Sequence, residues 1–199
     1  MTTDAGTREQ ILDAAIALIE SEGESAVRVD RVVASAGFTK PVLYRHFADK
    51  DDVIVHAQAE RYRRSLEWAN LGVAAMTNQV KSKKEFETRL AAAISTFATA
   101  ESRHHRSVRN EVLGSSVSRP ELQEAVANYN RAFISWLEVE IERWRTSGWT
   151  NPQFSSRDLA QWWAVQIHGR YFVEAGRDNE EPDEWLDVLL STVRFVLDL

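Results

Sequence analysis

The chain has 199 residues, of which 44% are hydrophobic and 27% charged, and its formal net charge is −6. Its length allows one large or two small domains with a substantial core, and its composition is that of a globular chain rather than a disordered one. The absence of Cys excludes disulfides and thiolate-bound metals, and no stretch reaches the roughly 18 to 20 apolar residues of a membrane span, so we expect a cytoplasmic protein with no membrane partner.

The first predicted elements are two helices near the N-terminus. Residues 8–22 place apolar side chains on one helical face, and Thr7 with Gln10 three residues later is a capping pattern for the start of this helix. Gly23 predicts its end. A second, shorter helix is predicted over residues 29–36 by the same periodicity.

A third short helix follows closely. Gly37 stops the second helix, and Thr39 is a suitable N-cap for a helix that extends to about Phe47. Pro41 falls in its first turn, where a missing N–H removes no helical hydrogen bond. Leu43 and Phe47 form the face that we expect to be buried.

Longer helices make up the rest of the chain, and no alternating strand pattern appears. Their predicted ranges run from Asp49 to about Leu71, from Ser82 to about Phe97, from Arg103 to Leu113, from Ser118 to Gly148, from Ser156 to Ala175 and from Asp183 to Leu197. The last two are apolar on all sides, which indicates burial on more than one face. We therefore expect their outer faces to pack against a second copy of the chain.

Positive charge is concentrated in one part of this acidic chain. Residues 28–50 hold five basic residues against two acidic ones, a local net charge of +3. They contain the second helix, a tight turn at 36–38 and the third helix, which together predict a helix-turn-helix. The side chains left outward on the third helix are mostly hydrogen-bond donors, as phosphates and base edges require.

The segment AGFTKPVLYRHFADKDDV, residues 36–53, resembles the DNA-recognition segment of the tetracycline-repressor (TetR) family. The resemblance covers about the first 55 residues, and the later helices agree in number and length. It implies an all-α, nine-helix homodimer that pairs through its last two helices. It also implies a helix-turn-helix DNA-binding domain at 1–50 and a ligand-binding and dimerisation domain at 51–199.

The same resemblance assigns roles to individual residues. It gives Lys40, Pro41 and Val42 to base edges. Phosphate contacts fall to Thr39, Tyr44, His46 and Lys50, with Arg28 as a weaker candidate. Two departures from the family pattern stand out: Val42 replaces the usual Thr, and Asp30 and Arg31 are exchanged in order.

An effector pocket is expected in the larger domain. Trp and Phe at helical spacing more often belong to a core or an interface than to a ligand site. Nevertheless, two facing helices offer aromatic walls with polar anchors. Their candidate ligand-binding residues are Tyr129, Phe133, Trp136, Trp163, Gln166 and Arg170. We expect a small apolar or aromatic ligand there.

Catalytic and metal motifs are missing from the sequence. The adjacent His104 and His105 cannot share one helix face, and no H-E-x-x-H, G-x-S-x-G or Gly-rich phosphate loop occurs. We expect no metal, no cofactor and no enzymatic activity. The favoured hypothesis is a ligand-released repressor of a palindromic operator. The alternatives are a DNA-binding dimer without a small-molecule effector and an α-helical enzyme with a vestigial helix-turn-helix.

Overall fold

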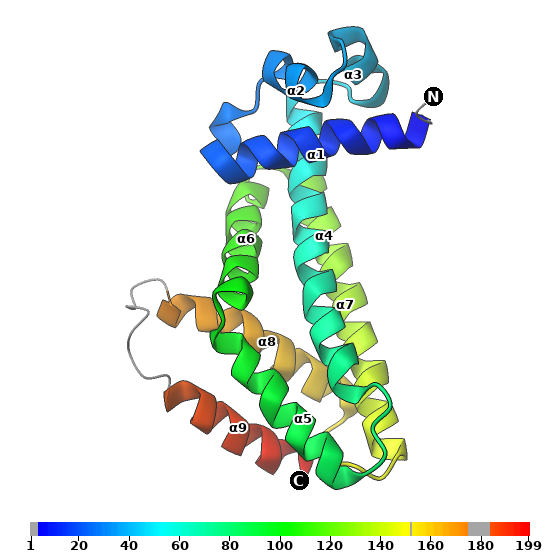
Figure 1. Cartoon of the computed structure of the whole chain (residues 1–199), viewed down its shortest axis with the longest axis vertical. Coiled ribbons are helices and arrows are strands. Elements are labelled where there is room, and N and C mark those ends of the chain that lie inside the picture. Colours follow the sequence, from blue (N-terminus) through cyan, green and yellow to red (C-terminus); the bar gives the residue numbers. More distant parts are fainter. Residues whose placement is uncertain (1–3, 152, 175–183) are drawn as a thin grey trace. The chain divides into compact units, whose positions relative to one another are not determined.

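The computed structural model describes residues 4–151, 153–174 and 184–199. Within these ranges the chain forms nine α-helices and two short 3-10 helices, with no strand, which confirms the all-α, nine-helix prediction (Figure 1). The elements in chain order are α1 (Asp4–Glu22), η1 (Glu24–Ala26), α2 (Val29–Ala36), α3 (Lys40–His46), α4 (Lys50–Thr77), α5 (Lys83–Ser95), η2 (Thr96–Ala98), α6 (Ala100–Ser116), α7 (Pro120–Thr146), α8 (Ser156–Glu174) and α9 (Glu184–Leu197). Among the described helices, none is long and apolar enough to cross a membrane.

The chain divides into two compact units. Unit 1 comprises Met1–Arg64 and Glu111–Val126, and unit 2 comprises Ser65–Asn110 and Ala127–Leu199. Helices α4, α6 and α7 each contribute residues to both units. The functional division at residue 50 stays a prediction.

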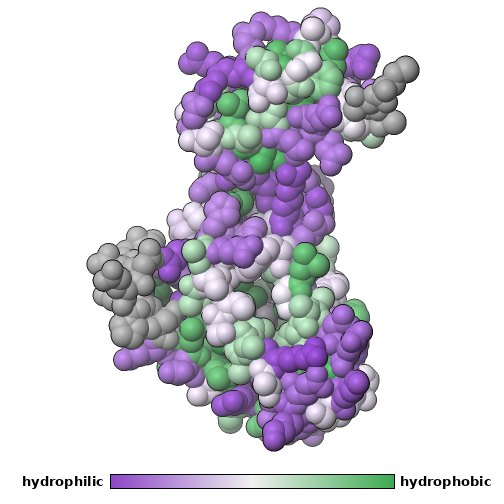
Figure 2. Space-filling view, in the orientation of Figure 1, coloured by the Kyte–Doolittle hydropathy of each residue, from purple (hydrophilic) through white to green (hydrophobic). Residues whose placement is uncertain are grey.

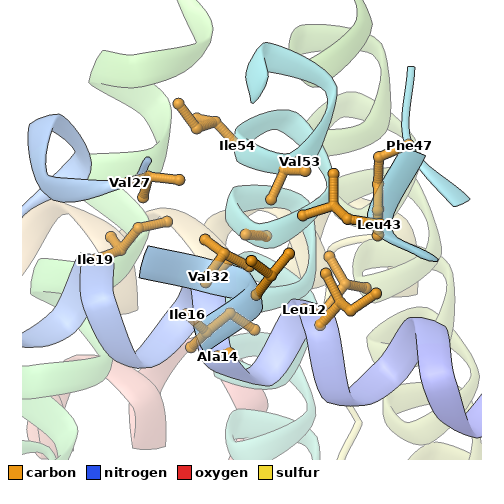
Figure 3. Packing of buried hydrophobic residues seen from close by; sticks show 14 residues of the cluster. Leu12, Ala14, Ile16, Ile19, Val27, Val32, Leu43, Phe47, Val53 and Ile54 are labelled. Atoms are coloured by element: carbon orange, nitrogen blue, oxygen red, sulfur yellow. The ribbon is translucent and has the colours of Figure 1, made fainter. Parts of the chain in front are cut away.

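The core of unit 1 is formed by α1, α2, α3 and the first turns of α4. Figure 3 shows Leu12, Ile16, Val32, Leu43 and Val53 directed toward one another from these four helices. Leu43 is fully buried and Phe47 is 2% exposed, as predicted from the sequence. Each side chain of this size stabilises the fold by about 1.5 to 3 kcal/mol when it leaves water. The short helix α3 is therefore held in place by its inward face.

The turn between α2 and α3 depends on a glycine. Gly37 has φ 73° and ψ 25°, the left-handed conformation, which residues with a Cβ rarely adopt. The N–H groups of Gly37 and Phe38 both donate to the carbonyl oxygen of Val33 and so close the C-terminus of α2. This turn lets α3 start two residues later in a new direction.

Two predicted helix starts are confirmed by their caps. The Asp52 N–H donates to the Asp49 carboxylate over 2.9 Å, and the Ala48 N–H donates to the Asp52 carboxylate over 2.7 Å. At α5, the Glu85 N–H donates to the Ser82 hydroxyl over 3.2 Å. In both places a side chain satisfies an N–H group that the helix itself leaves without a partner.

Three predicted helices have boundaries that are wrong by several residues. Helix α1 begins at Asp4, so Thr7 is buried inside the helix rather than acting as its cap. Helix α4 continues beyond Leu71 to Thr77, and α6 spans Ala100–Ser116 rather than residues 103–113. Gly72 and Gly114 lie inside these helices, because burial of neighbouring side chains such as Val73 and Val112 outweighs the low helix propensity of glycine. The predicted end at Ala175 and start at Asp183 lie outside the described residues.

Ion pairs also connect the helices of unit 1, in addition to its apolar core. The guanidinium of Arg61, on α4, is 4% exposed and lies 3.6 Å from Glu20 and 2.9 Å from Glu111. Arg119 likewise pairs with two carboxylates, 2.7 Å from Glu24 and 3.2 Å from Asp51. These pairs connect α1, η1, α4 and the ends of α6 and α7 that belong to unit 1.

Aromatic residues form much of the core of unit 2. The Phe86 ring lies between Trp144 and Trp149, with ring centroids 5.2 and 5.3 Å away. Trp144 is 1% exposed. The C-terminus of α9 joins this core, since Asn151 N–H donates to the Leu197 carbonyl over 3.3 Å.

Large apolar side chains remain exposed on the last two helices. Phe172 on α8 is 90% exposed and Phe195 on α9 is 82% exposed. Further exposed apolar residues on the same two helices are Val165, Val173 and Val188. The expected pattern of helices with apolar residues on outer as well as inner faces is thus present in the fold.

Candidate functional site

Helix α3 presents its polar side to solvent. Leu43 and Phe47 anchor one face of α3 in the core. Thr39, Lys40 and Tyr44 therefore stay exposed, and Tyr44 is 50% exposed. Thr39 is the N-cap residue, yet its side chain makes no capping hydrogen bond. Its hydroxyl is therefore available to an anion, whereas Pro41 has no N–H and the N–H groups of Val42 and Leu43 both donate to the Thr39 carbonyl.

Lys40 is already engaged by a neighbour on α2. Its Nζ lies 2.6 Å from a carboxylate oxygen of Asp30, and both side chains are mostly exposed. The hydrogen bond and the charge of Asp30 raise the pKa of Lys40. The inverted order of Asp30 and Arg31 thus places a carboxylate beside Lys40, the candidate base-reading lysine. Arg31 pairs instead with Glu22, at 2.9 Å between Nη1 and the carboxylate.

Two predicted contact residues are less exposed than the rest of α3. Val42 is partly buried and packs against the unit 1 core. The His46 side chain is 7% exposed, and its Nε2 lies 3.5 Å from the Asp4 carboxylate, too far for a hydrogen bond of normal geometry. Arg45 is 67% exposed and lies 3.4 Å from the same carboxylate. The exposed cation at this end of α3 is therefore Arg45 rather than His46.

The remaining candidates lie at the starts of α2, α3 and α4. Arg28 is the exposed N-cap residue of α2, Pro41 is exposed in the first turn of α3, and Lys50 is the exposed first residue of α4. Three of the exposed groups, Lys50, Thr39 and Arg28, stand at helix N-termini, where backbone N–H groups and the helix dipole favour anions. At the start of α4, the N–H groups of Asp52 and Ala48 already donate to the carboxylates of Asp49 and Asp52, so the Lys50 side chain is the group there that suits a phosphate.

Unit 2 contains a cavity of about 720 Å³. Residues of α4, α5, η2, α6 and α8 line it, and most of the lining is apolar. Figure 2 shows largely apolar or weakly polar surface in the middle of unit 2, over these helices. The large apolar lining residues are Trp68, Leu71, Met76, Phe97, Trp163 and Ile167. The volume suits a small organic molecule.

Of the six residues predicted to contact a ligand, Trp163 lines this cavity. The other five do not line it. Phe133 is 3% exposed in the core, and Arg170 donates to Glu174 over 2.7 Å and stacks on Trp185 at 4.4 Å. Tyr129, Trp136 and Gln166 are half-buried elsewhere on α7 and α8. Their role as ligand contacts stays a prediction.

The sequence reasoning overlooked the polar part of the lining, which lies on α6. Arg106 and Arg109 are each 1% exposed and both line the cavity. The available signal was their spacing, since Ser102, Arg106 and Arg109 repeat at three and four on the same stripe as the buried Val112. Arginine on an inward stripe is rarely buried without a specific reason.

One cluster of potential metal ligands occurs among the described residues. Asp52, His56 and Glu121 place ligand atoms within 4.8 Å of one another. The Asp52 carboxylate already accepts from the Ala48 N–H over 2.7 Å and lies 2.8 Å from His56 Nδ1. These bonds explain Asp52 and His56 as a helix cap and its partner. The adjacent His104 and His105, which were not expected to form a metal pair, lie edge to face with ring centroids 5.6 Å apart and are not part of this cluster.

Comparison with known proteins agrees with the sequence resemblance. Residues 11–57 match the sequence profile of the family "Bacterial regulatory proteins, tetR family". No curated protein shows a significant match to the chain.

Solved structures share the fold over nearly the whole chain. One, from Rhodococcus sp., is assigned to the TetR family of transcriptional regulators and has 20% identity and a TM-score of 0.67, covering 96% of this chain and 98% of that chain. Another TetR-family structure, from Mesorhizobium loti, has 14% identity and a TM-score of 0.72, with 98% of each chain covered. A transcriptional regulator from Saccharomonospora viridis, in complex with choline, has 19% identity and a TM-score of 0.66, with 96% of each chain covered.

Proposed function

We propose that this chain, whose residues 11–57 match the tetR family of bacterial regulatory proteins and whose fold is shared by a TetR-family regulator, acts as a dimeric, sequence-specific repressor. It binds a palindromic operator and is released by a small apolar or aromatic ligand. The observation that carries the proposal is α3, a helix fixed by Leu43 and Phe47 that exposes Thr39, Lys40 and Tyr44.

DNA recognition follows from the chemistry of the exposed residues. Lys40 at the start of α3 reaches guanine acceptors, while Thr39, Tyr44 and Lys50 contact phosphates on either side. An α-helix fits the major groove, and the flanking contacts fix its register. Arg45 joins the phosphate contacts because it is exposed at the same end of α3 as Tyr44.

Dimerisation is supported by the exposed apolar residues of α8 and α9. Phe172 and Phe195 are each more than four-fifths exposed in the isolated chain, and contiguous apolar surface on a soluble chain marks an interaction site. A two-fold dimer through these helices brings two recognition helices to successive half-sites about 34 to 36 Å apart. Each half of a palindrome is then read by one subunit.

Release by a ligand is supported by the unit 2 cavity and by α4. This helix begins at Lys50 and lines the cavity with residues between Trp68 and Met76. A ligand that favours a different position of α4 changes the affinity for DNA, and a coupling of about 1 to 3 kcal/mol suffices for a useful switch. The choline complex of the Saccharomonospora viridis regulator shows that a protein of this fold holds a small molecule.

The test is a binding titration with DNA from upstream of the protein's own coding sequence. We expect the wild-type chain to bind one palindromic segment, with an affinity that falls steeply with salt. A Lys40→Ala, Tyr44→Ala double variant should lose at least about tenfold in affinity, because one base contact and one phosphate contact are removed. Fluorescence anisotropy of labelled DNA measures the affinity of the wild type at each salt concentration and that of the double variant.

The matched control is Lys84→Ala, which removes an exposed lysine of α5 in unit 2. It should bind DNA like the wild type. Equal binding by the wild type and the double variant, with both folded by circular dichroism, would contradict recognition through α3.

A further inference from the structure

The charged residues that line the unit 2 cavity are mainly basic. They are Arg89, Arg106 and Arg109, with Glu101 as the acid of the lining; Arg89 pairs with Glu85 over 2.6 Å and Arg106 with Glu174. Glu101 is exposed and accepts a hydrogen bond from Trp68 Nε1 over 3.0 Å. Arg106 and Arg109 are instead almost completely buried. A charge in a buried position acts more strongly on a ligand than an exposed one, because water screens it less.

The two buried arginines differ in what they contact. Arg106 Nε donates to Glu174 over 2.7 Å, and its Nη2 donates to the carbonyl of Phe97 at the same distance. Glu174 also accepts from Arg170, so one carboxylate serves two guanidinium groups. Arg109 lies one turn further along α6 and donates through Nη1 to the backbone carbonyl of Ser65 over 3.0 Å. Because the two residues are three apart, both guanidiniums lie on the same side of α6.

Burial, assisted by these arginines, lowers the pKa of two histidines on α6 and α8. Burial, together with the charges of Arg109 and Arg106, lowers the pKa of His168 to about 4. Burial lowers the pKa of His105 as well, assisted by His104 and Arg109. Both rings are therefore neutral at neutral pH and add no positive charge to that of the arginines.

We propose that the unit 2 cavity binds an apolar anion, a medium-chain or aromatic carboxylate, with its carboxylate at Arg109 beside Arg106 and its apolar part between Trp68, Phe97 and Trp163. A carboxylate matches the planar donor groups of guanidinium. The aromatic and aliphatic lining matches a hydrocarbon body. The assignment as the effector rests on the proposed function, whereas the charge preference of the cavity rests on its own residues.

The test compares three ligands that share one alkyl chain and differ in the head group. Isothermal titration calorimetry on the full-length chain at neutral pH uses decanoate, decan-1-ol and decyltrimethylammonium, each below its micellar concentration. Decanoate should bind at least about tenfold more tightly than the other two, because a buried hydrogen bond to a charged group contributes more than a neutral one. Equal binding of the alcohol, tighter binding of the ammonium ion or no binding of any of the three would overturn the proposal.

A pair of arginine variants on α6 locates the carboxylate. Arg109→Gln should weaken decanoate binding about tenfold and leave decan-1-ol binding unchanged. Arg103→Gln removes an arginine of the same helix that does not line this cavity, and it should change neither. Undiminished decanoate binding by Arg109→Gln would overturn the assignment to Arg109. If that variant does not fold, Arg109→Lys takes its place, and the head-group comparison on the wild-type chain stands independently.

A DNA titration separates this inference from the proposed function. Decanoate binding accompanied by release of upstream DNA supports both. Decanoate binding that leaves DNA affinity unchanged overturns the effector role and keeps the anion site. Failure of the wild-type chain to bind DNA contradicts the proposed repressor, while the calorimetric head-group preference still decides the nature of the cavity.

Discussion

At the residue scale, the pairing of Lys40 with Asp30 is the contact that most directly affects recognition. The candidate base-reading lysine is held at 2.6 Å by a carboxylate on the preceding helix. Exposed ion pairs are weak, so in the proposed complex DNA would displace Asp30 at little cost. The carboxylate nevertheless opposes the approach of phosphates and orients the lysine before binding.

Removing that carboxylate charge should therefore strengthen DNA binding and reduce its selectivity. We expect Asp30→Asn to bind non-operator DNA about two- to fivefold more tightly, because Lys40 is released and local repulsion falls. Glu124→Gln on α7 changes the net charge equally at an exposed position away from α3 and serves as the control. Anisotropy titrations at several salt concentrations measure the effect, and equal gains in the two variants would show that only net charge matters.

His168 makes the stability of the fold depend on pH. Its Nδ1 lies 2.8 Å from the Ala164 carbonyl, and burial beside Arg109 and Arg106 lowers its pKa to about 4. The unfolded chain has a histidine pKa near 6.5, so between these values the unfolded state binds the extra proton. The neutral ring is favoured by folding, and the resulting stability is lost as the pH falls below about 6.5.

We expect the free energy of unfolding to fall by about 2 kcal/mol between pH 7 and pH 5 because of His168. The lowered pKa of His105 adds a change in the same direction. His168→Gln should show a correspondingly smaller fall, as measured by urea denaturation at each pH. Parallel curves for the variant and the wild type would contradict a neutral, buried His168.

At the element scale, some local signals of helix ends were confirmed and others were overridden by packing. Gly37 and the Asp49 and Ser82 caps act within a few residues of the chain, so the residues alone predict them. The ends of α4 and α6 escaped prediction because tertiary burial overrides Gly72 and Gly114, and burial is decided by residues distant in sequence.

The exposed side of α3 and the unit 2 cavity differ in how far the sequence predicts them, and the reason is again the role of distant residues. The exposed side of α3 follows from which residues of one short helix are apolar, so Thr39, Lys40 and Tyr44 could be identified from the sequence. The cavity is lined by parts of five elements, and which of the seven Trp residues reach it is set by packing. Trp163 was found, whereas Arg106 and Arg109 were not.

Gly37 in the α2–α3 turn and Gly114 inside α6 should respond in opposite ways to substitution by alanine. Gly37→Ala should destabilise the fold by about 1 kcal/mol or more, since a Cβ is strained at φ 73° even though no atom lies within 4 Å of it. Gly114→Ala, inside α6 and equally free of clashes, should stabilise it by up to about 1 kcal/mol. Urea denaturation measures both. A stabilising Gly37→Ala would show that the turn is not left-handed.

At the scale of the whole molecule, the apolar surface of α8 and α9 predicts the behaviour of the assembly. We expect Phe172→Glu with Phe195→Glu to yield folded monomers, because both side chains are exposed in the single chain and a buried charge opposes pairing. Operator affinity should fall by about 100-fold or more as the second binding head is lost. Sedimentation velocity and DNA titration measure these effects.

The control for this variant is Val117→Glu, which adds a charge at an 80% exposed apolar residue of unit 1. It should stay dimeric. A wild-type chain that sediments as a monomer at micromolar concentration, or a double variant that remains dimeric, would contradict pairing through α8 and α9.

The charged contacts inside unit 1 set how this part of the protein is able to rearrange. Arg119 reaches Glu24 and Asp51 at once, and Arg61 reaches Glu20 and Glu111. An arginine with two carboxylates in range can exchange one ion-pair partner for the other without exposing apolar surface to water. We therefore expect a rearrangement of the helices of unit 1 to exchange ion pairs rather than to open the apolar core.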